Sequence, residues 1–211
     1  MFLQQLVNGL TLGSTYALIA LGYTLVFGVL GIVNMAHGEV FMIGAFVALT
    51  LVTKFHVNIF VAMVGAMVVG AAVGVVLERV ALRPLRRRAV SHLAPLISTI
   101  GVAIFLESLA LRIFGPQSQA FPAQFGGGLI DLGLFKISPV QIVILGISFA
   151  LMILLKFWLQ HTRAGQFVRA TAESTETASL LGVNTDRVIV LTVALASGLG
   201  AVAGVLVGLA F

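Results

Sequence analysis

The chain has 211 residues, of which 60% are hydrophobic and only 9% are charged, with a formal net charge of +5. An ordinary soluble domain carries about 25% charged residues, so this composition excludes a typical water-soluble protein. The lack of cysteine excludes disulfides, thiolate metal sites and cysteine nucleophiles.

Six runs of the sequence are apolar enough to be membrane-spanning helices, which need roughly 20 such residues. In chain order they cover residues 10–33, 36–52, 58–77, 93–114, 139–155 and 188–211. The fourth run carries Glu107 and Arg112, whereas the third and the sixth contain no charge. The pattern predicts an all-α, polytopic membrane bundle with about six spans, forming a single transmembrane domain over residues 1–211.

The first two runs are separated by a very short polar break that contains Asn34 and His37, with Glu39 just after it. No basic segment precedes the first run, so we expect it to remain in the membrane rather than to be cleaved as a signal peptide. The shortness of the break leaves open whether both runs cross the membrane fully or one is re-entrant. We expect a hydrated turn at a membrane face here, although such breaks can also line a substrate pathway.

The connections carry the topology signals. Five arginines occupy ten positions after the third run, namely Arg79, Arg83, Arg86, Arg87 and Arg88. The positive-inside rule places this connection, residues 79–92, and the polar connection 156–187 in the cytoplasm. The two assignments agree because two spans separate them. The connection 115–136 is then external, and the arginines are expected to anchor the chain on anionic lipid.

Glycines recur at the four-residue spacing that lets membrane helices approach closely. The pattern predicts packing faces in the first, third and sixth runs, at Gly9 and Gly13, Gly70 and Gly74, and Gly200, Gly204 and Gly208. The sequence stops inside an apolar run at Phe211, and we therefore expect it to be a fragment that lacks further spans.

No catalytic constellation is found in the sequence. The histidines, His37, His56, His92 and His161, lack metal-ligand spacing, and each is expected near a helix end at the membrane interface. No phosphate-binding loop is present, so any nucleotide hydrolysis would belong to another chain. The basic residues cluster at the ends of apolar runs, which argues against binding to nucleic acid.

Residues 163–182 are expected to form one short amphipathic helix. One face carries Phe167, Ala170, Thr171, Ala178 and Leu181, and another carries Arg169, Glu173 and Glu176. Small residues and acids favour docking into the groove of another protein over resting on lipid headgroups. Gly182 is expected to end the helix, and Asn184, Thr185 or Asp186 to cap the sixth span.

Glu176, Thr177 and Ala178, followed by three residues and Gly182, resemble the loop by which permeases of ATP-driven (ABC) importers dock onto their ATPase subunits. Thr177 departs from that pattern, which has alanine there. Residues 8–23 and 34–39, with 78–84 and 178–188, are similar to the branched-chain amino-acid ABC permeases of the LivH type. The resemblance covers nearly the whole chain and is weakest at 115–136, and members of that family are longer.

The resemblance implies a permease subunit in a bacterial inner membrane, paired with a paralogous permease to form the pathway. It implies two cytoplasmic ATPase subunits, which would hold ATP and magnesium, and a periplasmic binding protein that delivers leucine, isoleucine or valine. The chain itself would catalyse no covalent chemistry. The coupling residues would be Arg169, Glu173, Glu176, Ala178 and Gly182.

Candidates for the transport pathway are Asn34, His37, Glu39 and Glu107, although structural packing is the simpler role for Glu107. Related permeases carry urea or short amides, which leaves the substrate open. A secondary transporter or channel without an ATPase would need relay groups in the membrane, and only Glu107 qualifies. A membrane enzyme would need titratable side chains converging at one depth, which the sequence does not provide.

Overall fold

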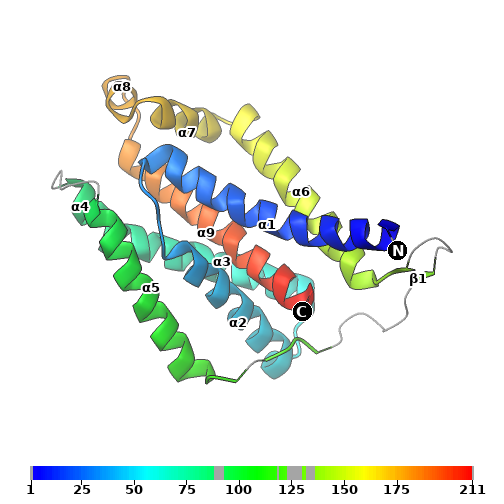
Figure 1. Cartoon of the computed structure of the whole chain (residues 1–211). Helices are drawn as coiled ribbons and strands as arrows, with labels where there is room; N and C mark the ends of the chain where they lie inside the picture. Colours follow the sequence, from blue (N-terminus) through cyan, green and yellow to red (C-terminus); the bar gives the residue numbers. More distant parts are fainter. Residues whose placement is uncertain (1, 88–92, 118, 123–129, 132–135, 211) are drawn as a thin grey trace.

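The computed structural model describes residues 2–87, 93–117, 119–122, 130–131 and 136–210 (Figure 1). Within these residues, six helices are long and apolar enough to cross a membrane, which confirms the expected all-α, polytopic fold. The elements are α1 (Phe2–Leu30), α2 (His37–Phe55), α3 (Ile59–Leu77), the π-helical turn η1 (Glu78–Leu82), α4 (Arg83–Arg87), α5 (Leu93–Phe114), α6 (Pro139–His161), α7 (Arg163–Glu173), α8 (Thr175–Leu180) and α9 (Thr185–Ala210).

Two short strands, β1 (Ile130–Asp131) and β2 (Lys136–Ile137), pair antiparallel in the connection between α5 and α6. Figure 1 shows this connection at one end of the bundle, together with the N-terminal end of α1. Elements α4, α7 and α8 lie at the opposite end. The arginine-rich connection and the polar connection before α9 therefore share one end, as the charge pattern predicted.

The third span is longer than expected, because α3 continues through η1 and α4 as far as Arg87. Arg79, Arg83 and Arg86 consequently lie on a helical extension of the span rather than in a loop. Arg88, the side chain of Arg87, His92 and Phe211 lie outside the described residues. The first span also begins earlier than expected, at Phe2, and the fifth ends later, at His161.

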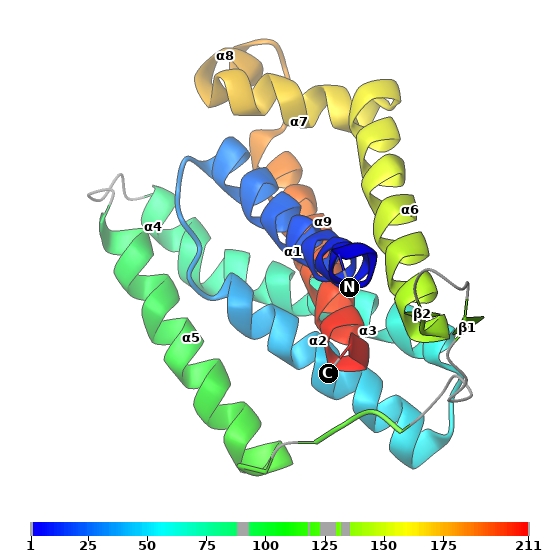
Figure 2. The ribbon, with the colours of Figure 1, turned by 45° about the vertical axis from the view of Figure 1, so that its right-hand side comes forward.

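Helix α9 is the centre of the bundle, with α1, α2 and α3 packed around it (Figures 1 and 2). Its apolar window is 78% buried, against 17–33% for the other five candidate spans. Figure 2 shows α5 and α6 standing at the two sides of this central group. They are the least buried candidate spans, each at 17%, so most of their surface faces away from the chain.

Glycine makes this close packing possible. A Cβ atom on Gly70 would come within 2.9 Å of the backbone oxygen of Ser197, and one on Gly204 would collide with the backbone oxygen of Phe41. The predicted glycine faces are therefore confirmed for α3 and α9. For Gly9 and Gly13, no described atom of this chain lies within 4 Å of an added Cβ, so the prediction is not confirmed within the described chain.

Candidate functional site

The break between α1 and α2 is a non-helical segment in which Asn34 and Ala36 are buried and Val33 and Met35 are exposed. Gly31, at φ 64, ends α1 in the left-handed region that favours glycine. Residues 31–36 then run back along the bundle, so that α2 begins inside it rather than level with the end of α1 (Figure 1). Asn34 is only 2% exposed. The side chain of Asn34 therefore points into the protein, while the neighbouring residues of the turn remain exposed.

Side chains of the protein satisfy the backbone of this break. The Oδ1 atom of Asn34 accepts a hydrogen bond from the N–H of Ala36 at 3.1 Å. The N–H of Met35 donates to Oγ1 of Thr99 on α5 at 3.2 Å. Non-helical backbone is tolerated at membrane depth only where the protein or a water-filled cavity satisfies it. These hydrogen bonds therefore hold the break in a defined conformation and link α5 to the start of α2.

His37, the first residue of α2, is fully buried between glycines of two other helices. A Cβ atom on Gly22 of α1 would lie 2.6 Å from Nε2 of His37, and one on Gly200 of α9 would lie 3.1 Å from it. The ring of Tyr23 meets the imidazole edge-on, with 4.6 Å between ring centroids. The expectation that His37 is interfacial is wrong, whereas His56 and His161 do lie exposed at helix ends.

Two carboxylates complete the group. Glu39, half-buried on α2, lies within electrostatic reach of the exposed Glu107 on α5. The hydroxyl of Tyr23 lies against the backbone of Gly38 and within electrostatic reach of Glu39. Asn34, His37 and Glu39 thus lie at the start of α2 or just before it, and Glu107 on α5 is related to them through its electrostatic effect on Glu39. Sequence spacing gave no hint that Tyr23 and Thr99 belong with them.

A hollow of about 350 Å³ adjoins this group on the surface of α1. Its lining is mostly apolar and aromatic, and consists of Tyr23, Thr24, Phe27, Val33 and Asn34. The start of α2 presents the positive end of a helix dipole, and the two carboxylates supply negative charge nearby. The region thus combines a helix start that carries Glu39 in its first turn with an adjoining apolar hollow.

The segment before α9 is two helices rather than the expected one. Ser174 has extended backbone at φ −157, and its Oγ accepts a hydrogen bond from the N–H of Thr177 at 3.1 Å, which caps α8. Thr162 caps α7 in the same way through the N–H of Gly165. The single-helix prediction failed because the Ser and Thr side chains satisfy helix-end amides and thereby restart the helix. We call α7 and α8 together the arm.

The exposed face of the arm also differs from the expected one. Of the face expected to dock on another protein, Phe167, Ala170 and Leu181 are exposed, whereas Thr171 and Ala178 are buried within the chain. Arg169, Glu173 and Glu176 are exposed as well. The most exposed apolar side chains are those of Leu180 and Leu181, at 81% and 78%. These adjacent leucines, which the helical periodicity did not single out as a pair, give the arm an apolar tip.

Gly182 ends the arm as predicted. Its φ of 84 is left-handed, and its N–H donates to the carbonyl of Ser179 at 3.0 Å. The N–H of Val183 donates to the carbonyl of Ala178, also at 3.0 Å, which completes a Schellman motif. Asn184 then caps α9 by accepting from the N–H of Arg187 at 3.1 Å. Of the three residues expected to cap α9, Asn184 is the one that does so in the structure.

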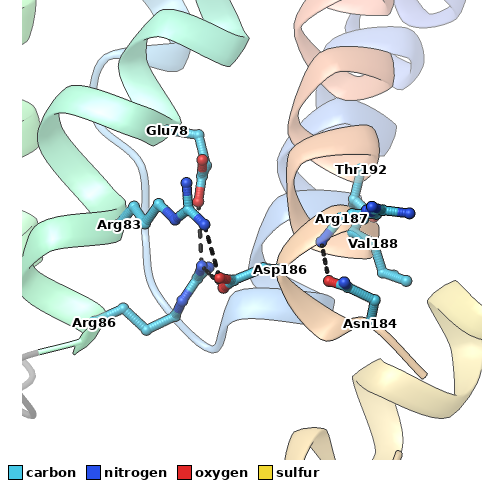
Figure 3. Close-up of polar contacts among 8 residues, drawn as sticks. All are labelled: Glu78, Arg83, Arg86, Asn184, Asp186, Arg187, Val188 and Thr192. Carbon is cyan, nitrogen blue, oxygen red and sulfur yellow. Dashed lines mark hydrogen bonds and ion pairs between the residues drawn. The ribbon is translucent and has the colours of Figure 1, made fainter. Parts of the chain in front are cut away.

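An ionic cluster joins the start of α9 to the end of the third span (Figure 3). The carboxylate of Asp186 pairs with Arg83 at 2.9 Å and with Arg86 at 2.7 Å. Arg86 also pairs at 3.2 Å with Glu78, whose side chain is fully buried in the π-helical turn. π-helical turns often occur at functional positions. The cluster fixes the helix that follows the arm to the extension of α3.

Comparisons with known proteins agree with this geometry. A family described as the permease component of the branched-chain amino acid transport system matches residues 5–211. The high-affinity branched-chain amino acid permease LivH of Escherichia coli K12 is 42% identical over 98% of this chain and 70% of its own length. BraD of Pseudomonas aeruginosa, with the same description, is 40% identical over 100% and 72%.

A more distant relative is the ribose import permease RbsC of E. coli K12. It is 26% identical over 97% of this chain and 61% of its own length. No solved structure matches the chain.

Proposed function

The chain belongs to the family of branched-chain amino acid transport permeases, and from this membership we propose that it is a membrane-spanning subunit of an ATP-driven importer of leucine, isoleucine and valine. The family match over residues 5–211 is the observation that carries the proposal. LivH of E. coli K12 and BraD, both named for branched-chain amino acids, are much closer in sequence than the ribose permease. The six candidate spans make the chain a multi-pass membrane protein.

The group around the start of α2 fits a branched-chain amino acid. The substrate carries a carboxylate, an ammonium group and a branched apolar side chain. The N-terminus of α2 would attract the carboxylate, as broken helices do in other transporters. Glu39 and Glu107 would attract the ammonium group, and the hollow beside Phe27 and Val33 would take the side chain. Asn34 and His37 would hold the break in shape.

The arm is the proposed docking element for the ATPase subunits, which would hold ATP and magnesium in place of this chain. Arg169, Glu173 and Glu176 are exposed and could contact a partner, whereas the buried Ala178 and the left-handed Gly182 maintain the shape of the arm. The ionic cluster at Asp186 then passes a movement of the arm to α3. The bundle would thereby switch between inward- and outward-facing states, as alternating access requires.

The proposed assembly contains a paralogous permease chain and a periplasmic binding protein in addition to the two ATPases, in the inner membrane of a bacterium. Residues 79–92 and 156–187 would face the cytoplasm and residues 115–136 the outside. The common placement of α4 and the arm at one end of the bundle supports this orientation.

Co-purification tests the docking proposal. Replacing both apolar tip residues, Leu180→Ser with Leu181→Ser, should abolish retention of the ATPase subunits on the tagged permease, because the exposed apolar tip is removed. Phe55→Ser is the matched control, since Phe55 is an exposed apolar residue at the far end of α2. Undiminished ATPase retention by the double variant would refute docking through the arm.

Uptake into proteoliposomes tests the substrate. With the cognate binding protein and ATP, the unaltered transporter should accumulate leucine. Glu39→Gln and Glu107→Gln should each raise the KM for leucine more than Arg112→Gln, which changes a charge farther along α5. Uptake of urea or a short amide instead of leucine would reassign the substrate. Leucine uptake without ATPase subunits would support a secondary transporter.

A further inference from the structure

A second hollow, unrelated to the start of α2, lies where the extension of α3 meets the start of α9. Its volume is about 420 Å³. Its polar lining consists of Arg79, Arg83, Asn184, Asp186 and Arg187, and its apolar lining of Val190, Leu191 and Ala194. Figure 3 shows the polar contacts beside it, with two arginines reaching across to Asp186.

The acids near this hollow are already neutralised, and the arginines are in excess. Both carboxylate oxygens of Asp186 are bound by arginine, one by Arg83 and one by Arg86. Glu78 is paired with Arg86. Within the described part of the chain, no ion pair is recorded for Arg79 or Arg187, both of which are exposed. Four arginines thus face two acids, leaving positive charge for a ligand.

One arginine in the lining has unused donor capacity. The Nε atom of Arg83 is buried and has no hydrogen-bond partner among the described residues. A buried donor without a partner costs free energy, so this atom adds to the local demand for an acceptor. Guanidinium groups bind phosphate oxygens with two parallel hydrogen bonds, which a halide cannot accept.

The other wall of the hollow is apolar and continues along α9. Val190, Leu191 and Ala194 follow Arg187 at helical spacing, so they lie on the same side of the helix. Leu191 is 38% exposed although α9 is otherwise the most buried span. Moving inward from the end of the bundle, the hollow therefore changes from cationic to apolar.

We propose that this hollow binds the phosphate of an anionic phospholipid, with Arg79 and Arg187 as its principal ligands. Basic pockets between membrane helices at a membrane face are suited to such headgroups. The apolar wall distinguishes a lipid from free phosphate, because only a lipid has acyl chains to place against Leu191. The bound lipid bridges α3 and α9 beside the ionic cluster and reinforces their connection.

Lipid retention by the assembled transporter tests this inference. The transporter is reconstituted in phosphatidylcholine bilayers with and without phosphatidylglycerol, extracted into detergent, and examined by native mass spectrometry. Phosphatidylglycerol should be retained by the unaltered protein, and retention should fall on the order of tenfold or more in the Arg79→Gln/Arg187→Gln variant. Arg112→Gln, which removes an exposed arginine near the opposite end of α5, should retain as much as the unaltered protein.

Equal retention by the double variant and the control would overturn the site. Displacement of the bound lipid by millimolar inorganic phosphate or glycerol phosphate would reassign it to a soluble phosphate. If the double variant does not assemble, a measurement on the unaltered protein still tests whether the lipid binds. Its unfolding temperature should rise when phosphatidylglycerol is added to phosphatidylcholine, and the absence of a rise would reject the proposal. Neither readout depends on transport, so both are independent of the proposed substrate.

Discussion

Helix α9 and the arm are neighbours in the sequence and both are rich in small residues. However, α9 is buried at the centre of the bundle, whereas much of the arm is exposed. In α9, Ala and Gly side chains are enclosed by α1, α2 and α3, and Gly200 and Gly204 meet His37 and the backbone of Phe41 directly. In the arm, Ala170 is exposed and the large Leu180 and Leu181 project outward. Small residues therefore indicate close packing only where a second backbone is present to complete the contact.

The two regions also obtain their shape differently. Packing fixes α9, so its conformation depends on the rest of the bundle. Caps set the helix ends in the arm: Thr162 begins α7, Ser174 begins α8, and Gly182 ends it, while Val168 of α7 also packs in a buried cluster with Val26 and Ile189. Capping interactions are local, which leaves the outer surface of the arm free for a partner. The following substitutions should separate packing from capping.

The largest effect is expected where a glycine of α2 touches α9. A Cβ atom on Gly44 would come within 2.5 Å of the backbone oxygen of Ala201, and backbone cannot yield easily. Gly44→Leu should destabilise the bundle by about 3 kcal/mol or more, seen as early unfolding or aggregation in fluorescence-detected gel filtration after heating. Gly146→Leu on α6, where no described atom lies within 4 Å, should leave the profile unchanged. Similar profiles for both variants would contradict the packing of α2 on α9.

The next effect is expected at the junction between the two regions. Arg86→Met would leave the fully buried Glu78 without its ion-pair partner, while Asp186 would keep Arg83. Stranding a buried charge in this way costs about 3 kcal/mol, which should appear as a lower unfolding temperature.

Adding Glu78→Gln to Arg86→Met removes the stranded charge and should recover much of this loss. Such recovery is the outcome that distinguishes a charge effect from lost packing of the Arg86 side chain. A double variant no more stable than Arg86→Met would show that the pair contributes through its packing alone.

The smallest effect is expected in the arm. Gly182→Ala places a side chain at a φ of 84, which should cost about 1 kcal/mol. Because Ala178 is the one buried residue of α8, faster hydrogen exchange should be confined to α8 and the unfolding temperature of the bundle should stay constant. Gly9→Ala, at a position with no described neighbour within 4 Å, serves as the control. Loss of global stability in Gly182→Ala would show that the arm is part of the core.

The sequence sufficed for features that depend on local pattern. Apolar run length identified the six spans, and the φ-sensitive role of Gly182 followed from its place after a helix. Features that depend on a distant partner were missed or misjudged. Spacing could not show that Gly9 and Gly13 lack a contact, nor that Thr99 binds the backbone of Met35. The break at Ser174 was missed because periodicity on either side of it continues across the cap.

The position of α9 at the centre of the bundle has a consequence for biosynthesis. Helices α1, α2 and α3 leave the ribosome first, but the surface on which they pack is translated only after α5, α6 and the arm. Until then Gly44, Gly70 and Gly74 present a groove with no helix to fill it. The early spans can pack on one another, as α2 does on α3, but the bundle is completed only in a late step when α9 is inserted among them.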